Sequence, residues 1–164
     1  MSFKLWSIGS HAPHHAAPVW RLLSFDDLRV SELYEALRLR SEVFVVEQAC
    51  VYQDMDGLDR QAMHLFGVQG GELQAYARCL EPGVKFAEAS IGRVLVRAAA
   101  RGTGLGHTLL EQAVLATAQV WGPQAIRIGA QAHLAGYYAK HGFKDIGKPY
   151  MEDGIPHLEM LRDA

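Results

Sequence analysis

Apolar residues recur along the first part of the chain in two patterns, one typical of a strand and one of a helix. Residues 19–25, V-W-R-L-L-S-F, suit a β-strand. In residues 31–48 apolar residues repeat at helical spacing, and Ser31 is the expected N-cap. The pattern therefore predicts a strand, then a helix, and then a polar loop at residues 53–59.

Short β-compatible runs and two helical runs make up the rest of the chain. The expected strands are residues 64–69, 72–80, 90–96, 125–131, 143–146 and 158–161. One expected helix begins at Leu105 and ends near Gly122–Pro123. A second begins at Leu134 and has Gly142 as its C-cap. Gly70–Gly71 joins the first two of these strands in a pattern typical of a hairpin. This order predicts a single α/β domain, a mixed, mostly antiparallel sheet of six to seven strands flanked by helices.

Residues 1–18 differ from the rest because they show neither a helical nor a strand period. They contain prolines, small residues and the histidines His11, His14 and His15, so we expect a flexible N-terminal leader ahead of one domain at 19–164. Imidazoles can bind a divalent metal, but a site needs further fixed ligands. We expect a solvated tail and no metal.

Composition narrows the classes of partner. The net charge of -2 supplies no basic field for nucleic acid or an anionic membrane, and a neutral or cationic small partner fits better. Cys50 and Cys79 are too few for a disulfide framework and lack C-x-x-C spacing. No apolar run reaches the roughly 18 residues of a membrane span. We therefore expect a cytoplasmic protein with reduced thiols.

A glycine-rich stretch, residues 96–110, V-R-A-A-A-R-G-T-G-L-G-H-T-L-L, lies between a predicted strand and a predicted helix. Backbone N–H groups at such a turn can bind an anion, although tight packing of strand and helix could also require glycine. A dinucleotide fold needs glycine where His107 stands, and a P-loop needs a lysine just before its Ser or Thr. A third interpretation is that the loop binds the pyrophosphate of coenzyme A.

At Arg101-x-x-Gly104-x-Gly106 the sequence resembles the GNAT superfamily of acyl-CoA-dependent N-acetyltransferases, whose motif is Q/R-x-x-G-x-G/A. The order of elements fits that fold over roughly residues 19–163. The stretches L-R-S-E-V-F-V-V-E-Q, Y-Q-D-M-D-G, I-G-R-V-L-V, I-G-A-Q-A-H and E-D-G-I-P-H are similar to its ElaA-like branch. The resemblance implies an N-acetyltransferase that moves acetyl from acetyl-CoA to a primary amine by direct attack, without a metal.

The same resemblance implies where the cofactor binds. The pantetheine arm pairs with the strand before the glycine loop, and backbone N–H groups of the loop hold the pyrophosphate. The implied cofactor residues are Val94, Leu95, Val96, Arg101, Gly102, Thr103, Gly104, Leu105, Gly106 and His107.

Tyr138, four residues before Gly142–Phe143, matches the tyrosine that the family uses as general acid. A phenol with a pKa near 10 can hydrogen-bond and protonate a departing thiolate, whose thiol has a pKa of about 8.5. Packing is the alternative role for Tyr138. For the general base, Ser90 stands where some members have glutamate; the candidates are Glu88, on the same strand face, Glu47, Asp54, Asp56, His64 and a water chain.

The acceptor is the least determined part of the prediction. The acids at Asp54, Asp56 and Glu152–Asp153 suggest a negative rim that attracts a cationic amine, with ordinary solvated loops as the alternative. Resemblance places Glu47, Gln48 and His157 at the acceptor site, and His64 is a further candidate. A small molecule or a protein amine would satisfy these residues, and a homodimer is left open. The rival functions are a non-catalytic acyl-CoA sensor and a nicotinamide oxidoreductase.

Overall fold

The computed structural model describes residues 17–164, so the histidines of the predicted leader lie outside the described residues. Within them the chain forms a seven-stranded sheet in the order β1-β2-β3-β4-β5-β7-β6. The neighbouring strands in this part of the chain are antiparallel except for β4 and β5, which run parallel. The predicted α/β class and the mixed, mostly antiparallel sheet are confirmed.

The elements follow the predicted order. The strands are β1 (Val19–Ser24), β2 (Ala62–Gln69), β3 (Glu72–Leu80), β4 (Ala89–Val96), β5 (Ile126–Gln131), β6 (Lys144–Glu152) and β7 (Ile155–Arg162), and the α-helices are α1 (Val30–Arg40), α2 (Leu105–Trp121) and α3 (Ala135–Ala139). None of the helices in residues 17–164 is long and apolar enough to cross a membrane.

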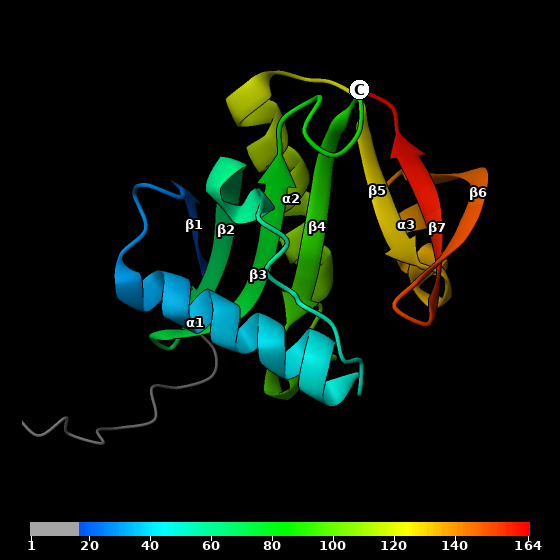
Figure 1. Cartoon of the computed structure of the whole chain (residues 1–164). Coiled ribbons are helices and arrows are strands. Elements are labelled where there is room, and N and C mark those ends of the chain that lie inside the picture. The colour runs from blue at the N-terminus through cyan, green and yellow to red at the C-terminus, as the bar shows by residue number, and fades with distance from the viewer. Residues whose placement is uncertain (1–16) are drawn as a thin grey trace, which may run out of the picture.

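Helices cover both faces of the sheet, with α1 across one face and α2 against the other (Figure 1). Successive strand residues point to opposite faces. Leu65 accordingly joins the apolar cluster that contains Leu109 of α2, whereas its neighbour Phe66 joins the cluster that contains Leu39 of α1. The sheet therefore has a separate apolar core on each side.

The first helix starts and ends differently from the prediction. It begins at Val30 with Arg29 as its cap residue, and the Glu32 carboxylate accepts the Arg29 backbone N–H at 2.9 Å. The predicted N-cap at Ser31 was therefore wrong. The helix can begin earlier because Glu32, its third residue, accepts the backbone N–H of the cap residue Arg29. The helix continues as a π-helical segment, η1 (Ser41–Glu47), a wider turn that is common at functional sites.

The C-terminal strands are longer than predicted because they form one hairpin. Asp153 and Gly154 connect them with φ of 49° and 78°, as a tight hairpin turn requires. The expected strands at 143–146 and 158–161 were too short, since Pro149 and its polar neighbours resemble a loop. β6 is an edge strand, where a missing N–H is tolerated.

The parallel pair β4 and β5 separates soon after it begins. Only Ala89 pairs with Ile126 and Ser90 with Arg127, although β4 continues to Val96 and β5 to Gln131. The β5-facing backbone groups of β4 beyond Ser90 therefore have no strand partner. Buried backbone N–H and C=O groups require partners, so this edge is suited to an extended, amide-containing ligand.

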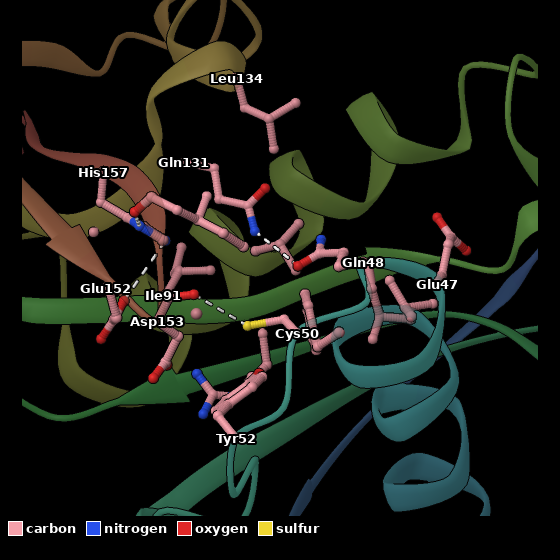
Figure 2. A pocket seen from close by; sticks show the side chains of 18 of the residues that line it. Glu47, Gln48, Cys50, Tyr52, Ile91, Gln131, Leu134, Glu152, Asp153 and His157 are labelled. Atoms are coloured by element: carbon pink, nitrogen blue, oxygen red, sulfur yellow. Dashed lines mark hydrogen bonds and ion pairs between the residues drawn. The ribbon is translucent and has the colours of Figure 1, made fainter.

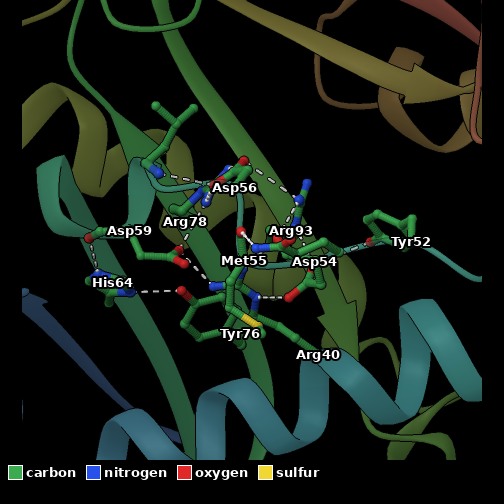
Figure 3. A network of polar contacts seen from close by, with 12 residues as sticks. Arg40, Tyr52, Asp54, Met55, Asp56, Asp59, His64, Tyr76, Arg78 and Arg93 are labelled. Atoms are coloured by element: carbon green, nitrogen blue, oxygen red, sulfur yellow. Dashed lines mark hydrogen bonds and ion pairs between the residues drawn. The ribbon is translucent and has the colours of Figure 1, made fainter.

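A buried network of ion pairs holds the loop between η1 and β2 against the sheet (Figure 3). Arg40 of α1 donates to Asp54 at 2.8 Å and to Asp59 at 2.7 Å. Arg78 of β3 donates to the same Asp59 oxygen at 2.9 Å and to Asp56 at 2.6 Å. The two guanidinium side chains are only 1% and 2% exposed, so the carboxylates are required to neutralise them.

Asp59 is the central carboxylate of this network. Burial by itself would raise its pKa, but the hydrogen bonds and charges of Arg40 and Arg78 outweigh that effect and lower it. A lowered pKa in the folded state means that ionised Asp59 stabilises the fold above about pH 4, and that this contribution is lost as the pH falls towards the folded-state pKa.

We predict that Asp59→Asn lowers the free energy of unfolding by about 3–5 kcal/mol at pH 7, because it leaves two buried guanidinium groups undercompensated. The difference in the free energy of unfolding between variant and wild type shrinks below about pH 4, because Asp59 of the wild type becomes protonated as the pH falls and then no longer neutralises the arginines. Urea unfolding across this pH range measures both effects.

Glu35→Gln is the matched control, since it removes an ion pair with Arg38 in which both side chains are 45% exposed. It should cost no more than about 1 kcal/mol. A cost for Asp59→Asn as small as that of the control would show that the network does not hold the loop.

Candidate functional site

A cavity of about 640 Å³ lies where β4 and β5 separate (Figure 2). Its lining comes from η1, the loop after it, β4, the glycine loop, β5, α3 and the C-terminal hairpin. The residues that line it include Glu47, Gln48, Asp56, Val94, Leu95, Val96, Arg101, Gly106, Gln131, Tyr137, Tyr138, Glu152, Asp153 and His157. The cavity thus joins the predicted cofactor residues to part of the predicted acceptor site.

A bulge in β4 shapes the wall of the cavity. The register with β3 shifts by one residue between Tyr76 and Arg78, and Arg93 adopts a φ of 51°. This left-handed conformation costs a non-glycine residue roughly 1–2 kcal/mol. The Arg93 side chain is held by Asp54, with Nε 2.6 Å from Oδ1 and Nη2 2.9 Å from the backbone oxygen. The ion-pair network therefore maintains the bulge that re-aims the backbone near Val94.

Two glycines of the glycine loop are explained by their backbone conformation and not by close contacts with neighbouring atoms. Gly102 and Gly104 have φ of 78° and 86°, and a Cβ at either position would meet no atom within 4 Å. Gly106 has no positive φ, and its nearest contacts would be ordinary ones at 3.8 Å to Tyr137 and Val96. Tight strand–helix packing thus does not explain these glycines, and the free space lies at the N-terminus of α2, where an anion is stabilised.

Arg101 and Glu47 form a bidentate pair at the rim of the cavity. Arg101 Nη1 and Nη2 lie 2.5 Å and 2.9 Å from the two Glu47 oxygens, and Arg101 Nε donates to the Val96 carbonyl at 3.0 Å. The hydrogen bonds from Arg101 lower the pKa of Glu47. Glu47 is therefore an ionised, paired carboxylate and a weak base.

Two adjacent tyrosines of α3 reach the cavity in different ways. Tyr138 is 8% exposed and packs edge-on against Phe143. Burial raises the pKa of Tyr138, so its hydroxyl keeps its proton. Tyr137 donates from Oη to the Gly106 carbonyl oxygen at 2.5 Å, and burial raises its pKa to about 12. Tyr138 thus lines the cavity with a protonated hydroxyl, whereas Tyr137 is hydrogen-bonded to the first turn of α2.

The remaining glycine-loop residues that were predicted to hold a cofactor do not line the cavity: Gly102, Thr103, Gly104, Leu105 and His107. Leu105 is buried in the apolar core. The His107 ring is exposed and hydrogen-bonds through Nδ1 to His141 Nε2 at 2.8 Å. A contribution of these residues to anion binding would come from the backbone.

Several residues predicted for catalysis or the acceptor have structural partners instead. Asp54 belongs to the buried network and does not line the cavity. His64 is 1% exposed, and its ring bonds to the Tyr76 hydroxyl at 2.7 Å and to the Asp59 carbonyl at 2.9 Å. Burial lowers the pKa of His64. The structure does not bring Asp54 or His64 into the cavity.

Glu88 and Asp56 are also engaged by arginines. Glu88 precedes β4, lies 3.6 Å from Arg127 and is not part of the cavity lining. Asp56 lines the cavity, and despite partial burial its hydrogen bonds with Arg78 hold its pKa well below the usual range. Asp56 therefore adds a fixed negative charge to the wall and has little capacity as a base.

The other end of the cavity is built by Gln48, Gln131 and the C-terminal hairpin (Figure 2). Gln131 Nε2 donates to Gln48 Oε1 at 3.1 Å, so the predicted Gln48 joins β5 to the end of η1. Four further residues line the cavity and were not predicted from the sequence as site residues: Gln131, Lys85, Cys50 and Tyr52. The only signal for Gln131 was its place at the end of a predicted strand.

Comparisons with known proteins match most of the chain. The family described as "Acetyltransferase (GNAT) domain" matches residues 29–163. Protein ElaA of Escherichia coli is 42% identical over 147 residues, 88% of this chain and 96% of ElaA. UPF0039 protein sll0451 of Synechocystis is 42% identical over 143 residues, 87% of this chain and 93% of that protein.

Solved structures are similar in fold as well as in sequence. An acyl-CoA N-acyltransferase from Pseudomonas aeruginosa superposes with a TM-score of 0.84 and 44% identity, covering 89% of this chain and 99% of that one. The crystal structure of Escherichia coli ElaA has a TM-score of 0.83 and 40% identity, with coverage of 89% and 99%. The residues matched by the family model, 29–163, contain β4, the glycine loop and the C-terminal hairpin.

Proposed function

The chain belongs to the GNAT family of acyl-CoA-dependent acyltransferases, and from this premise we propose that it transfers the acetyl group of acetyl-CoA to a primary amine by direct attack. Membership confirms the resemblance seen in the sequence. The observation that carries the proposal is one continuous cavity that contains the open edge of β4, Gly106 of the glycine loop and the protonated Tyr138.

The residues of this cavity fit coenzyme A. The vacant space beside Gly102 and Gly104 lies at the N-terminus of α2, where a pyrophosphate would accept backbone N–H bonds. The unpaired edge of β4 offers Val94, Leu95 and Val96 to the amides of the pantetheine arm. When bound, acyl-CoA supplies an acyl group activated as a thioester. The bulge at Arg93 interrupts the regular path of the β4 backbone, which supports a role for one of its N–H groups in polarising the thioester carbonyl oxygen.

Tyr138 holds the proton that the departing thiolate requires. Its pKa is raised by burial, so the hydroxyl is protonated throughout the neutral range and available as a donor. Positioned acids of this kind contribute about 10²- to 10⁴-fold to rate. This role separates an enzyme from a non-catalytic acyl-CoA sensor, which would use the glycine loop without needing Tyr138.

The wall of the cavity at the hairpin end favours a cationic acceptor. Asp56, Glu152 and Asp153 line the cavity, where Lys85 offsets part of the charge of Glu152, and an amine with a pKa near 10 is an ammonium ion at neutral pH. A primary amine, either of a small molecule or of a protein, is thus the proposed acceptor.

We predict that Tyr138→Phe lowers kcat about 100-fold or more with little change in the affinity for coenzyme A, because only the proton donor is lost. Thiol release from acetyl-CoA is measured against a panel of amines, including a polyamine, an amino acid ester and a lysine peptide.

Tyr137→Phe is the paired control, since it removes a hydroxyl that bonds the Gly106 carbonyl and should act on the KM for acetyl-CoA. Binding of coenzyme A by the wild type without turnover of any amine would favour the sensor. Equal rates for wild type and Tyr138→Phe would rule out Tyr138 as the acid.

We predict that Gly106→Ala weakens coenzyme A binding at least tenfold, because the added methyl group occupies space at the proposed anion seat. The fold has room for this methyl group, and alanine favours a helix by roughly 0.5–1 kcal/mol, so stability should be unchanged or higher. Calorimetric titration with coenzyme A and thermal unfolding measure the two effects.

Gly136→Ala is the matched control, a helical glycine with no atom near its added Cβ and outside the cavity lining. It should leave coenzyme A affinity unchanged. Unchanged affinity in Gly106→Ala would place the pyrophosphate elsewhere.

A further inference from the structure

The hairpin β6–β7 presents a histidine and a glutamate to the acceptor end of the cavity. We infer that His157 is the general base that deprotonates the acceptor ammonium, with Glu152 stabilising the resulting imidazolium. The inference rests on the proposed acyl transfer and adds a catalytic role to a residue for which the sequence suggested only acceptor binding.

The hydrogen bond of His157 determines which ring nitrogen is basic. Nδ1 lies 2.8 Å from the backbone oxygen of Ile155. A carbonyl oxygen only accepts, so Nδ1 must carry the proton. In the neutral ring Nε2 therefore has a free lone pair, and this nitrogen is the one that can accept a proton from a substrate.

Glu152 lies close to this nitrogen without being hydrogen-bonded to it. The distance from His157 Nε2 to Glu152 Oε2 is 3.6 Å, longer than the roughly 2.7–2.9 Å of a charge-assisted hydrogen bond. At this distance the carboxylate acts on the ring through its charge and makes no hydrogen bond to Nε2. An ammonium ion drawn to the carboxylate would meet the lone pair of Nε2, and the protonated ring would then be stabilised by Glu152.

The surroundings orient the ring towards the cavity (Figure 2). His157 is 9% exposed, stacks on Tyr150 of β6 with ring centroids 5.4 Å apart, and pairs across the sheet with the neutral Gln131 of β5. The titratable and charged groups of the neighbouring elements are Glu152, Tyr150 and Lys148 of β6, Glu159 of β7, Arg127 of β5, and Lys85, which interacts with Glu152.

The other candidate bases are paired or lie outside the cavity. Glu47, Asp54 and Asp56 each pair with arginine, Glu88 is not part of the cavity lining, and both ring nitrogens of His64 are hydrogen-bonded in the core. His157 differs from His64 in one respect. Each ring donates to a carbonyl, but the second nitrogen of His64 accepts from Tyr76, whereas that of His157 faces the cavity.

The proton balance of the step is complete. An N–H bond of the ammonium breaks as the Nε2–H bond forms, and the freed electron pair on nitrogen attacks the thioester carbon. A C–N bond forms and the C–S bond breaks, with the thiolate taking a proton from Tyr138. The second proton lost by the nitrogen restores Tyr138, and the proton on His157 passes to solvent.

His157→Asn tests the inference, because the asparagine nitrogen can replace Nδ1 in the bond to Ile155 while no base remains at the position of Nε2. With an amine that the wild type acetylates, we expect kcat/KM at pH 7 to fall about 100-fold. The deficit narrows to a few-fold above about pH 9.5, where the free amine no longer needs a base. Thermal unfolding and coenzyme A binding should match the wild type.

Glu152→Gln and Asp153→Asn form a matched pair of charge removals on the same hairpin. Glu152→Gln should lower kcat, because the imidazolium formed in the reaction loses its stabilising carboxylate. Asp153→Asn should raise KM without lowering kcat, since among the described residues its carboxylate makes no ion pair or hydrogen bond with the ring. Equal losses of kcat in the two variants would overturn the role of Glu152.

Nitrogen-15 NMR of the imidazole in the full-length protein provides a readout that needs no acceptor. We expect the neutral His157 ring to carry its proton on Nδ1; a proton on Nε2 would overturn the inference. Full activity of His157→Asn at pH 7, or an equal deficit at every pH, would also overturn it. Failure of the wild type to acetylate any amine would instead contradict the proposed function.

Discussion

The early separation of β4 from β5 is the constraint on which the site depends. Two strands that run parallel normally bond along their length, but here the pairing ends after Ser90. Each strand keeps its other neighbour, so the sheet remains intact while one internal edge is left open. The cavity, the access of a ligand to the β4 backbone and the position of α3 beside that edge all follow from this departure from regular pairing.

The buried arginines and aspartates make this departure stable. A residue with the conformation of Arg93 is strained, and a loop as acidic as residues 53–59 would otherwise be free in solvent. Arg40, Arg78 and Arg93 bind the carboxylates of this loop from α1, β3 and β4. The acids therefore serve mainly to fix the wall of the cavity, and only Asp56 among them also faces it.

The titratable side chains fall into two groups, those whose partners lie in the protein interior and those that line the cavity. Asp54, Asp59 and His64 are saturated with partners in the interior. Tyr138 and His157 are also largely buried, yet both line the cavity. A buried polar group that faces a cavity and keeps a donor or a lone pair is suited to catalysis, because its environment restricts its partners to the ligand.

The sequence by itself determined the order of elements, the hairpin at Gly70–Gly71 and the family, through the glycine loop and the spacing of Tyr138. These depend on local conformation and periodicity, which neighbouring residues encode. The tertiary structure alone decided the rest: the bulge at Arg93, the pairing of Arg101 with Glu47, and the lone pair of His157. The partners of Arg93 and Arg101 are distant in sequence, and those of His157 depend on the hairpin that brings Ile155 and Glu152 to its ring. The identity of a residue does not reveal whether its charge or proton is already engaged.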